Sequence, residues 1–261
     1  MILLDPLARP VIGHRGNRAH APENTLASFQ EAVALGVDAL EFDLRVSRDG
    51  VLMVFHDATL ERTTDAVGPL ADRTAAELGR VDAGANFTPD GGITFPWRGR
   101  GVTVSTFSAI VESLPRALPF IIELKTPAAT ELVRAAIALH GIAARVIVAG
   151  FDPATTRPLR GAGFALGAST PDVVRLVLPA LLRRRLGAPP FEALCIPPRW
   201  NRIPVPIAAL ARALRGSGTV IHVWTINEPS DAIDLWNVGV QGIVSDDPGT
   251  ILAVRPRPPV G

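Results

Sequence analysis

The sequence of 261 residues has one cysteine and one lysine, and it has no long uninterrupted run of apolar residues. The single cysteine, Cys195, excludes an internal disulfide framework. No apolar run reaches the length of a membrane-spanning helix, and the N-terminus MILLDPLARP lacks the charged and apolar regions of a secretory signal. These absences predict a cytoplasmic protein without a membrane span.

Charge of one sign is also scarce, because the formal net charge is +1. No cluster of basic residues is interleaved with aromatic residues, so nucleic acid is not expected as a partner. The densest cationic stretch, residues 183–185, follows the apolar run LVLPALL. It favours a solvated helix end over a contact with a membrane surface. The sequence does not indicate an oligomeric state.

Short β-rich apolar runs alternate with longer helical patterns along the whole chain. Helical spacing is clearest at residues 23–36, where Gly36 closes the pattern. Alternating helices and buried strands predict a parallel sheet, and eight strands in a chain of this length predict an α/β fold of the (β/α)8 TIM-barrel type. The expected strands are residues 11–14, 39–44, 120–125, 145–151, 164–169, 193–197, 219–226 and 242–246.

A ninth apolar run, residues 51–57, follows the second strand after a short Arg-Asp-Gly segment. A parallel crossover needs about a dozen residues, so this run must return as the second arm of a hairpin, with Asp49 and Gly50 in the turn. The pairing predicts that His56 lies near Asp43, at the outgoing end of the second strand.

Residues 58–102 interrupt the second strand-helix unit. They are rich in Gly, Asp, Thr and Pro and are too many for a simple connection. We expect a small inserted subdomain or loop region above the barrel mouth, within a single domain that spans residues 1–261.

Acidic side chains recur at a spacing of two residues. Residues two apart in a strand share a face, so Glu41 and Asp43 point the same way, and so do Glu123 and Lys125. The outward face of a parallel barrel packs under helices, which leaves these side chains inside, near the carboxyl ends of the strands. Three buried carboxylates need positive charge. One divalent cation, Mg²⁺ or Ca²⁺, would supply it; a salt-bridge network with arginines from neighbouring loops is the alternative.

Two histidines are expected at the same rim by independent routes. His14 ends the first strand within the sequence HRG, and His56 arrives on the hairpin arm. Their ordinary pKa lies close to neutral pH, which suits general acid and general base roles. Arg15 and Lys125 offer positive charge to an anionic group. Together these residues predict chemistry on a phosphate.

Some polar residues have structural explanations that compete with a functional one. His222 and Trp224 share a face of the seventh strand. Trp224, nearer the end of the strand, is expected to line the site, whereas His222 is expected to be a hydrogen-bonded core residue. Residues 23–25, Glu-Asn-Thr, open the first helix, and capping is a sufficient explanation for at least one of them.

Five segments, taken in order, resemble one enzyme family. They are HRG at 14–16, APENTLASFQEAVALGVDALEFDLRVSRDGVLMVFHDATLERTTDAVG at 21–68, IELK at 122–125, VWTIN at 223–227 and GIVSDDP at 242–248. This combination is similar to the glycerophosphodiester phosphodiesterases over residues 11–248. The resemblance implies a (β/α)8 barrel with an insertion after the second strand and a divalent metal ion, Mg²⁺ or Ca²⁺, as cofactor.

The resemblance also implies roles for individual residues. The expected reaction is metal-dependent hydrolysis of a small-molecule glycerophosphodiester to glycerol 3-phosphate and an alcohol, within glycerol and lipid metabolism. His14 and His56 are the implied acid-base pair. The implied metal ligands are Glu41, Asp43 and Glu123. The implied substrate contacts are Arg15, Lys125 and Trp224.

Two alternative functions remain at this point. A lysophospholipase D-type enzyme would need an apolar entry, for which Phe87, Phe95 and Trp97 of the insertion are candidates. A non-catalytic barrel that binds phosphodiesters is the other, although such a protein has no need of two proton carriers. The sequence does not distinguish Mg²⁺ from Ca²⁺, the acid from the base, the head group of the substrate, or attack by water from attack by a substrate hydroxyl.

Overall fold

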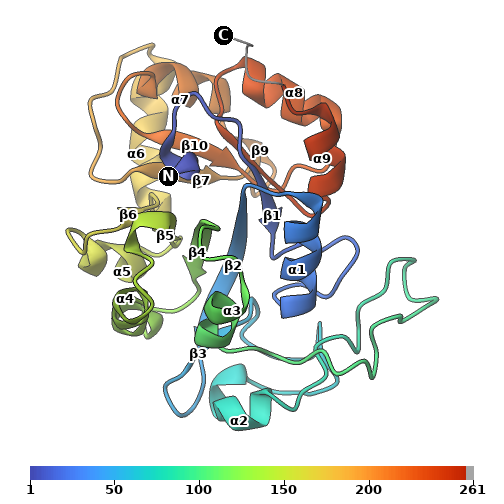
Figure 1. Ribbon diagram of the computed structural model, residues 1–261. Coiled ribbons are helices and arrows are strands. Elements are labelled where there is room, and N and C mark those ends of the chain that lie inside the picture. Colours follow the sequence, from blue (N-terminus) through green and yellow to red (C-terminus); the bar gives the residue numbers. More distant parts are fainter. Residues whose placement is uncertain (257–261) are drawn as a thin grey trace.

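Eight parallel strands form a barrel in the computed structural model of the chain, which describes residues 1–256 (Figure 1). The last five residues, which our predicted domain includes, lie outside this described part. The barrel strands are β1 (Val11–His14), β2 (Ala39–Val46), β4 (Phe120–Leu124), β5 (Val146–Ala149), β6 (Ala165–Leu166), β7 (Ala193–Ile196), β10 (Val220–Val223) and β11 (Gly242–Ser245).

The strand order confirms the predicted (β/α)8 barrel. Hydrogen bonds join the strands in the order β6-β5-β4-β2-β1-β11-β10-β7. A parallel bridge between Gly167 and Ala193 then connects the two ends of this order, so that the sheet closes on itself. Closure brings the carboxyl ends of all eight strands to one rim.

Helices follow the strands and cover the outer face of the barrel. The first begins at Thr25, whose side chain accepts a hydrogen bond from the Ser28 amide, and ends at Gly36, where φ is 86°. Within the described residues, no helix is both long enough and apolar enough to cross a membrane. The outer helices are α1 (Leu26–Leu35), α3 (Phe107–Ser113), α4 (Ala129–Leu139), α5 (Pro153–Thr156), α6 (Thr170–Leu181), α7 (Ile207–Leu214), α8 (Pro229–Asn237) and α9 (Pro248–Val254).

The alternation of side chains along β2 separates the core from the site. Leu40, Phe42 and Leu44 point outward and belong to the apolar layer between the strands and the helices. The inward-facing apolar side chains form a second, smaller cluster inside the barrel, which includes Ile12 and Ile121. The acidic residues of β2 share the inward face, as the spacing of two residues predicts.

The N-terminal segment closes the opposite end of the barrel. A short 3-10 helix, η1 (Ile2–Leu4), places Leu3 in the inner apolar cluster. The Leu3 carbonyl oxygen lies 2.9 Å from His222 Nε2, and the His222 side chain is fully buried. The expectation that His222 is a hydrogen-bonded core residue is therefore confirmed.

Acid is expected to destabilise the fold through His222. Burial lowers its pKa from 6.5 to about 4. Between these values the unfolded chain binds the proton more readily, so the free energy of unfolding falls as the pH decreases from about 6.5 to about 4, by about 3 kcal/mol. We expect His222→Gln to reduce this pH dependence, as measured by urea unfolding across the window. An unchanged dependence in the variant would contradict the assignment.

The predicted hairpin is present. Strand β3 (Leu52–Val54) runs antiparallel to β2, with Leu44 opposite Val54 and Val46 opposite Leu52. Gly50 has a φ of 79°, a left-handed conformation that glycine adopts without strain. The register carries the chain beyond Val54 toward the rim, where His56 follows.

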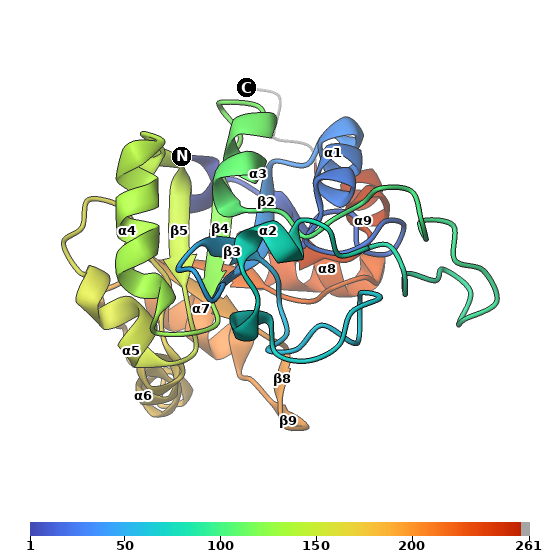
Figure 2. The ribbon, with the colours of Figure 1, turned by 90° about the horizontal axis from the view of Figure 1, so that it is seen from below.

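The insertion, residues 58–102, contains little regular structure. It holds a 3-10 helix, η2 (Leu70–Asp72), and a short α2 (Ala75–Leu78), and the rest is turns and loops. Figure 2 shows that part of it projects from the barrel as a long loop. Its apolar side chains form a small cluster with β3 and its flanks, whose buried members are Met53, Phe55, Leu60, Leu70, Leu78, Val81, Ala83 and Val104.

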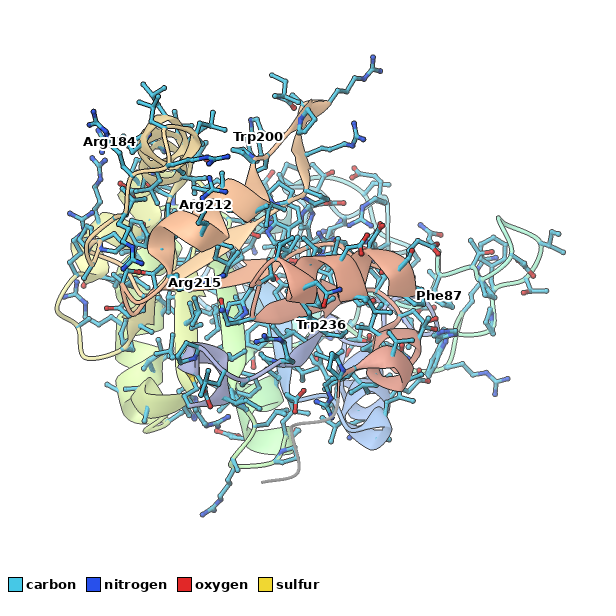
Figure 3. The ribbon with its side chains drawn as sticks, turned by 90° about the horizontal axis from the view of Figure 1, so that it is seen from above. Phe87, Arg184, Trp200, Arg212, Arg215 and Trp236 are labelled. Carbon is cyan, nitrogen blue, oxygen red and sulfur yellow. The ribbon has the colours of Figure 1, made fainter. Side chains whose placement is uncertain are left out.

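A second hairpin, which the sequence did not indicate, follows β7. It consists of β8 (Arg199–Trp200) and β9 (Ile203–Pro204). The two turn residues, Asn201 and Arg202, both have positive φ, as the tight turns of two-residue hairpins require. Figures 2 and 3 show this hairpin on a different side of the molecule from the long loop of the insertion, with Trp200 far from Phe87.

Candidate active site

The turn after β1 places His14 and Arg15 at the rim. The Arg15 amide donates a hydrogen bond to the Glu41 carbonyl oxygen at 2.9 Å, which ties this turn to β2. Gly16 follows with a φ of 95°, and a Cβ atom there would lie 2.3 Å from Ser28 Oγ. Only glycine fits this position. In the sequence HRG, the first two residues therefore supply polar groups to the rim, and the glycine allows the backbone of the turn.

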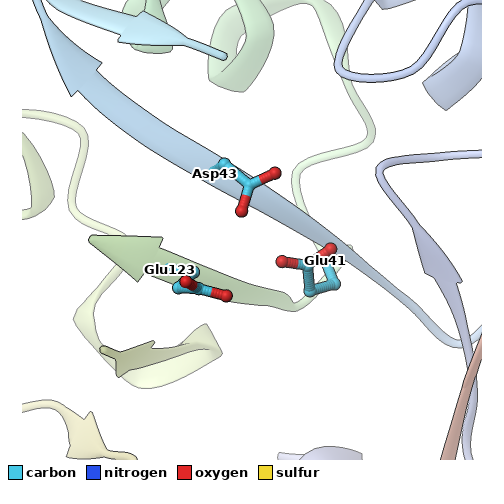
Figure 4. Close-up of side chains that lie close together, drawn as sticks. All are labelled: Glu41, Asp43 and Glu123. Carbon is cyan, nitrogen blue, oxygen red and sulfur yellow. The ribbon is translucent and has the colours of Figure 1, made fainter. Parts of the chain in front are cut away.

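Three carboxylates converge inside the barrel mouth. In the registers of neighbouring strands, His14 is opposite Glu41, and Asp43 is opposite Glu123. Glu41, Asp43 and Glu123 each offer a carboxylate oxygen within 4.8 Å of the others. Figure 4 shows these carboxylates, from β2 and β4, turned toward one another. The structure thus brings together the three acids that the strand spacing placed on one face.

The cations at this cluster leave one acid without a basic partner. Lys125 Nζ lies 3.0 Å from Asp43 Oδ1 and also contacts the Glu123 carboxylate. Arg15 Nε lies 3.1 Å from Asp43 Oδ2. Among the described residues, no Lys or Arg side chain forms an ion pair with Glu41, whose carboxylate lies 3.8 Å from His14 Nε2, a partner that is charged only when protonated. An arginine network alone therefore does not balance the three acids.

The electrostatics of the cluster fit a divalent cation. Burial raises the pKa of Glu41 well above its usual value, and the charge of Asp43 raises it further. Burial and Asp43 raise the pKa of Glu123 in the same way. Burial also opposes ionisation of Asp43, but Lys125 and Arg15 hold its pKa below the usual value. Three buried oxygen donors that lack one positive charge are a suitable ligand set for Mg²⁺ or Ca²⁺.

His14 is held by a carboxylate from the far end of the chain. Its Nδ1 lies 2.6 Å from Asp246 Oδ1, and its Nε2 faces Glu41. Burial lowers the pKa of His14, and the hydrogen bond to Asp246 acts in the opposite direction. The Asp246 carboxylate accepts a hydrogen bond from Nδ1–H, which leaves Nε2 free to face the acidic cluster.

His56 has a similar arrangement. Its Nδ1 lies 2.5 Å from Asp57 Oδ1, and its side chain is 31% exposed, against 8% for His14. Burial lowers the pKa of His56, and the charge of Asp43 raises it. Each histidine thus uses Nδ1 for a carboxylate and keeps Nε2 for another partner. This is the arrangement expected of groups that transfer protons.

A chain of charged hydrogen bonds joins the two histidines, with Glu23 at its centre. Glu23 accepts hydrogen bonds from Arg62 at 2.7 and 2.8 Å and from Arg18 at 2.9 Å. Although Glu23 is largely buried, these arginines and Arg15 hold its pKa far below the usual value. The complete chain runs His56, Asp57, Arg62, Glu23, Arg18, Asp246 and His14.

Of the three residues before α1, only Thr25 is a helix cap. Glu23 belongs to the charged chain, and Asn24 donates a hydrogen bond from Nδ2 to Asp43 Oδ2 at 2.9 Å. Asn24 is buried and has a φ of 59°. The sequence did not indicate either role; the one available signal was that both residues lie within the segment APENT, which belongs to the family resemblance. Asp57 and Asp246 were likewise within quoted segments but without an assigned role.

One pocket of about 80 Å³ collects nearly all the predicted site residues. Phe151, which follows β5, also lines it: its ring centroid lies 5.7 Å from that of Trp224, and Lys125 Nζ lies 5.8 Å above its ring. Asp43 is the one predicted residue behind the pocket wall, where its side chain is almost fully buried. The predicted residues in the lining are His14, Arg15, Glu41, His56, Glu123, Lys125 and Trp224.

The aromatic residues of the insertion do not line this pocket. Phe87 lines a separate hollow beside Arg62. The Phe95 ring lies under the Arg98 guanidinium, and the Trp97 indole donates a hydrogen bond to the His20 carbonyl oxygen. These three candidates for an apolar entry therefore do not line the pocket, because the insertion packs beside the turn after β1.

The barrel and its pocket define an enzyme of the (β/α)8 class. The model of the Glycerophosphoryl diester phosphodiesterase family matches residues 14–161, and the chain belongs to this family of phosphoric diester hydrolases. Over 248 residues it is 30% identical to a glycerophosphodiester phosphodiesterase of Caldanaerobacter subterraneus subsp. tengcongensis, a match that covers 93% of this chain and 96% of that protein.

Solved structures show the same fold. A glycerophosphoryl diester phosphodiesterase domain from Mycobacterium tuberculosis superposes with a TM-score of 0.82 at 22% identity, over 95% of this chain and 98% of that one. A phosphodiesterase of Oleispira antarctica, solved in complex with its product sn-glycerol-3-phosphate, has a TM-score of 0.73 at 25% identity, over 95% of this chain and 96% of that one.

Proposed function

We propose that this chain hydrolyses glycerophosphodiesters to glycerol 3-phosphate and an alcohol, with a divalent metal ion and with His14 and His56 as the acid-base pair. The observation that carries the proposal is that both histidines line the pocket of the acidic cluster, each with a carboxylate on Nδ1. Family membership and the glycerol phosphate bound by the Oleispira relative support the choice of substrate. The cytoplasmic location and the single domain over residues 1–261 stay predictions.

The acidic cluster supplies the metal site of this proposal. Glu41, Asp43 and Glu123 would hold Mg²⁺ or Ca²⁺ through carboxylate oxygens. When bound, such an ion would supply Lewis-acid chemistry, polarising a phosphoryl oxygen and stabilising negative charge in the transition state.

The remaining steps use side chains of the chain itself. Arg15 and Lys125 bind the phosphate oxygens and stabilise their developing charge. The oxygen that attacks phosphorus belongs to water or to a hydroxyl group of the substrate. One histidine accepts its proton on Nε2, and the other donates a proton to the alcohol oxygen whose bond to phosphorus breaks. Asp57 and Asp246 each keep their imidazole in one tautomer and stabilise its protonated form. Trp224 lines the pocket and would contact the substrate there.

The proposed function is tested with a panel of glycerophosphocholine, glycerophosphoethanolamine and glycerophosphoinositol. Release of glycerol 3-phosphate is followed with a coupled assay in the presence of Mg²⁺ or Ca²⁺. We expect turnover of at least one of these compounds. Failure to release glycerol 3-phosphate from any of them, by a folded and metal-supplied protein, would refute the proposal.

Lys125→Arg is expected to lower kcat/KM by roughly a hundredfold, as the loss of a placed charge contact does. Lys125 is the single lysine of the chain, and its ammonium fits between Asp43 and Glu123 with the Phe151 ring beside it. A guanidinium keeps the charge, but its planar fork needs space that the carboxylates or the phosphate occupy.

The measurement pairs steady-state kinetics with thermal unfolding, because the midpoint of unfolding is expected to change little. Arg48→Lys is the matched control, since Arg48 forms an exposed ion pair with Glu77 away from the pocket. Activity of Lys125→Arg within a few fold of wild type would show that the choice of lysine has no catalytic significance.

A further inference from the structure

A second, apolar cavity of about 220 Å³ adjoins the catalytic pocket. It lies between α6 and the β8–β9 hairpin, and no charged side chain is among the described residues that line it. We call it the apolar groove. Its walls include Val173, Val174 and Val177 of α6, Pro197 after β7, and Trp200 and Ile203 of the hairpin.

The apolar groove is continuous with the catalytic pocket. Phe151, Ala168 and Cys195 line both cavities. The Phe151 ring packs against Trp200 on the groove side, at 5.5 Å between centroids, and against Trp224 on the pocket side. A molecule bound at the acidic cluster therefore has an apolar path that leads outward past Phe151.

The groove exposes hydrocarbon that no described part of the chain covers. The exposed fractions are 63% for Val174, 69% for Ile203 and 41% for Trp200. A contiguous exposed apolar surface of this kind is characteristic of binding sites. Burial raises the pKa of the Cys195 thiol to about 12, which disfavours its reactive thiolate form. The groove has the chemistry for binding an apolar group and none for a reaction.

We propose that the apolar groove binds the hydrocarbon chain of a single-chain phospholipid whose phosphodiester lies at the acidic cluster. The inference rests on the proposed function and specifies its substrate class. Continuity with the catalytic pocket favours a chain of the substrate over a protein partner, because only a substrate must occupy both cavities at once. Apart from Thr170 and Cys195 the described lining is apolar, and it carries no charged group that would bind a charged head group.

The first test compares glycerophosphocholine with lysophosphatidylcholines of increasing acyl length, all kept monomeric below their critical micelle concentrations. Each methylene that enters the groove is expected to raise kcat/KM by up to about fourfold, until the groove is filled. A direct binding measurement uses alkylphosphocholines, which carry a phosphodiester and one hydrocarbon chain but no glycerol. Their affinity, followed by tryptophan fluorescence, is expected to rise with chain length in the same way.

The second test uses matched variants on α6. Val174 and Leu178 are similarly exposed, at 63% and 65%, but only Val174 lines the groove. Val174→Asp places a carboxylate beside the hydrocarbon chain and is expected to lower the ratio of kcat/KM for long-chain substrate over glycerophosphocholine by roughly tenfold. Ile203→Asp, on the hairpin, is expected to do the same without altering α6. Leu178→Asp should leave the ratio within about twofold.

The possible outcomes separate this inference from the proposed function. If none of the glycerophosphodiesters is hydrolysed, the proposed function itself is wrong. If glycerophosphocholine is hydrolysed but kcat/KM and affinity do not depend on chain length, the groove does not bind hydrocarbon. Equal effects of Val174→Asp and Leu178→Asp would also overturn the assignment.

Discussion

Alanine at position 14 or at position 56 is expected to lower kcat on glycerophosphocholine by roughly 10³-fold. In each case the variant loses an imidazole that lines the pocket and whose Nδ1 is held by a carboxylate. Water that fills the space does not ionise near neutral pH as an imidazole does, so it does not replace the proton carrier. The measurement is steady-state release of glycerol 3-phosphate at saturating metal, with thermal unfolding to show that each variant is folded.

The matched control is His20→Ala. His20 belongs to the same connection after β1 but is exposed and paired with Asp247 at 3.4 Å, outside the pocket. Its removal is expected to leave kcat unchanged. Near wild-type activity of His14→Ala or His56→Ala would remove that residue from the acid-base pair.

A substrate with a nitrophenol leaving group distinguishes the acid from the base. Such a group departs without protonation, so the variant that lacks the general acid should recover most of its activity. The variant that lacks the general base should remain inactive, because the attacking hydroxyl still has to lose its proton. Equal recovery of both variants would mean that neither histidine acts as a dedicated acid.

Removal of divalent cations is expected to abolish hydrolysis, and Mg²⁺ or Ca²⁺ is expected to restore it. The physical reason is that no described Lys or Arg forms an ion pair with Glu41, since the cations at the cluster pair with the other two acids. A cation that binds only the folded state also stabilises it, so the thermal midpoint should rise with added metal. The thermal shift reports metal binding, and the rate of hydrolysis reports whether the bound metal is needed for activity.

Glu123→Gln sharpens this test because it removes one charged ligand and keeps the size of the side chain. We expect the variant to lose most of the metal-induced thermal shift and most of its activity. Glu77→Gln, a change at an exposed site of the insertion, should lose neither. A fully active preparation without bound metal would contradict the metal site.

The inner wall of the site could be predicted from local regularities. Glu41 with Asp43, and Glu123 with Lys125, share a face because the strand period is two. His56 could be placed because a connection of three residues permits a hairpin and not a parallel crossover. These rules depend only on neighbouring residues, so they hold before the chain is folded.

The partners of these groups could not be predicted in this way. His14 and Asp246 are separated by 232 positions in the sequence and meet only because β11 pairs with β1 when the barrel closes. Arg62 reaches Glu23 from the insertion, whose irregular backbone has no sequence periodicity from which the contact could be predicted. The positions of the two histidines could therefore be predicted from the sequence, whereas the charged chain that holds them could not.

The same distinction applies to the fold and its cavities. The sequence by itself determined the eight strands, the alternation with helices and the inward face of the acids, because periodicity and connection length are written in adjacent residues. Only the tertiary structure decided which carboxylate orients each histidine and where an apolar surface adjoins the pocket. The groove arises from Val174 on an ordinary helix, Trp200 on a hairpin too short to have a pattern, and Phe151 between them. Such a site exists only when separate segments pack together, and its residues share no spacing along the chain.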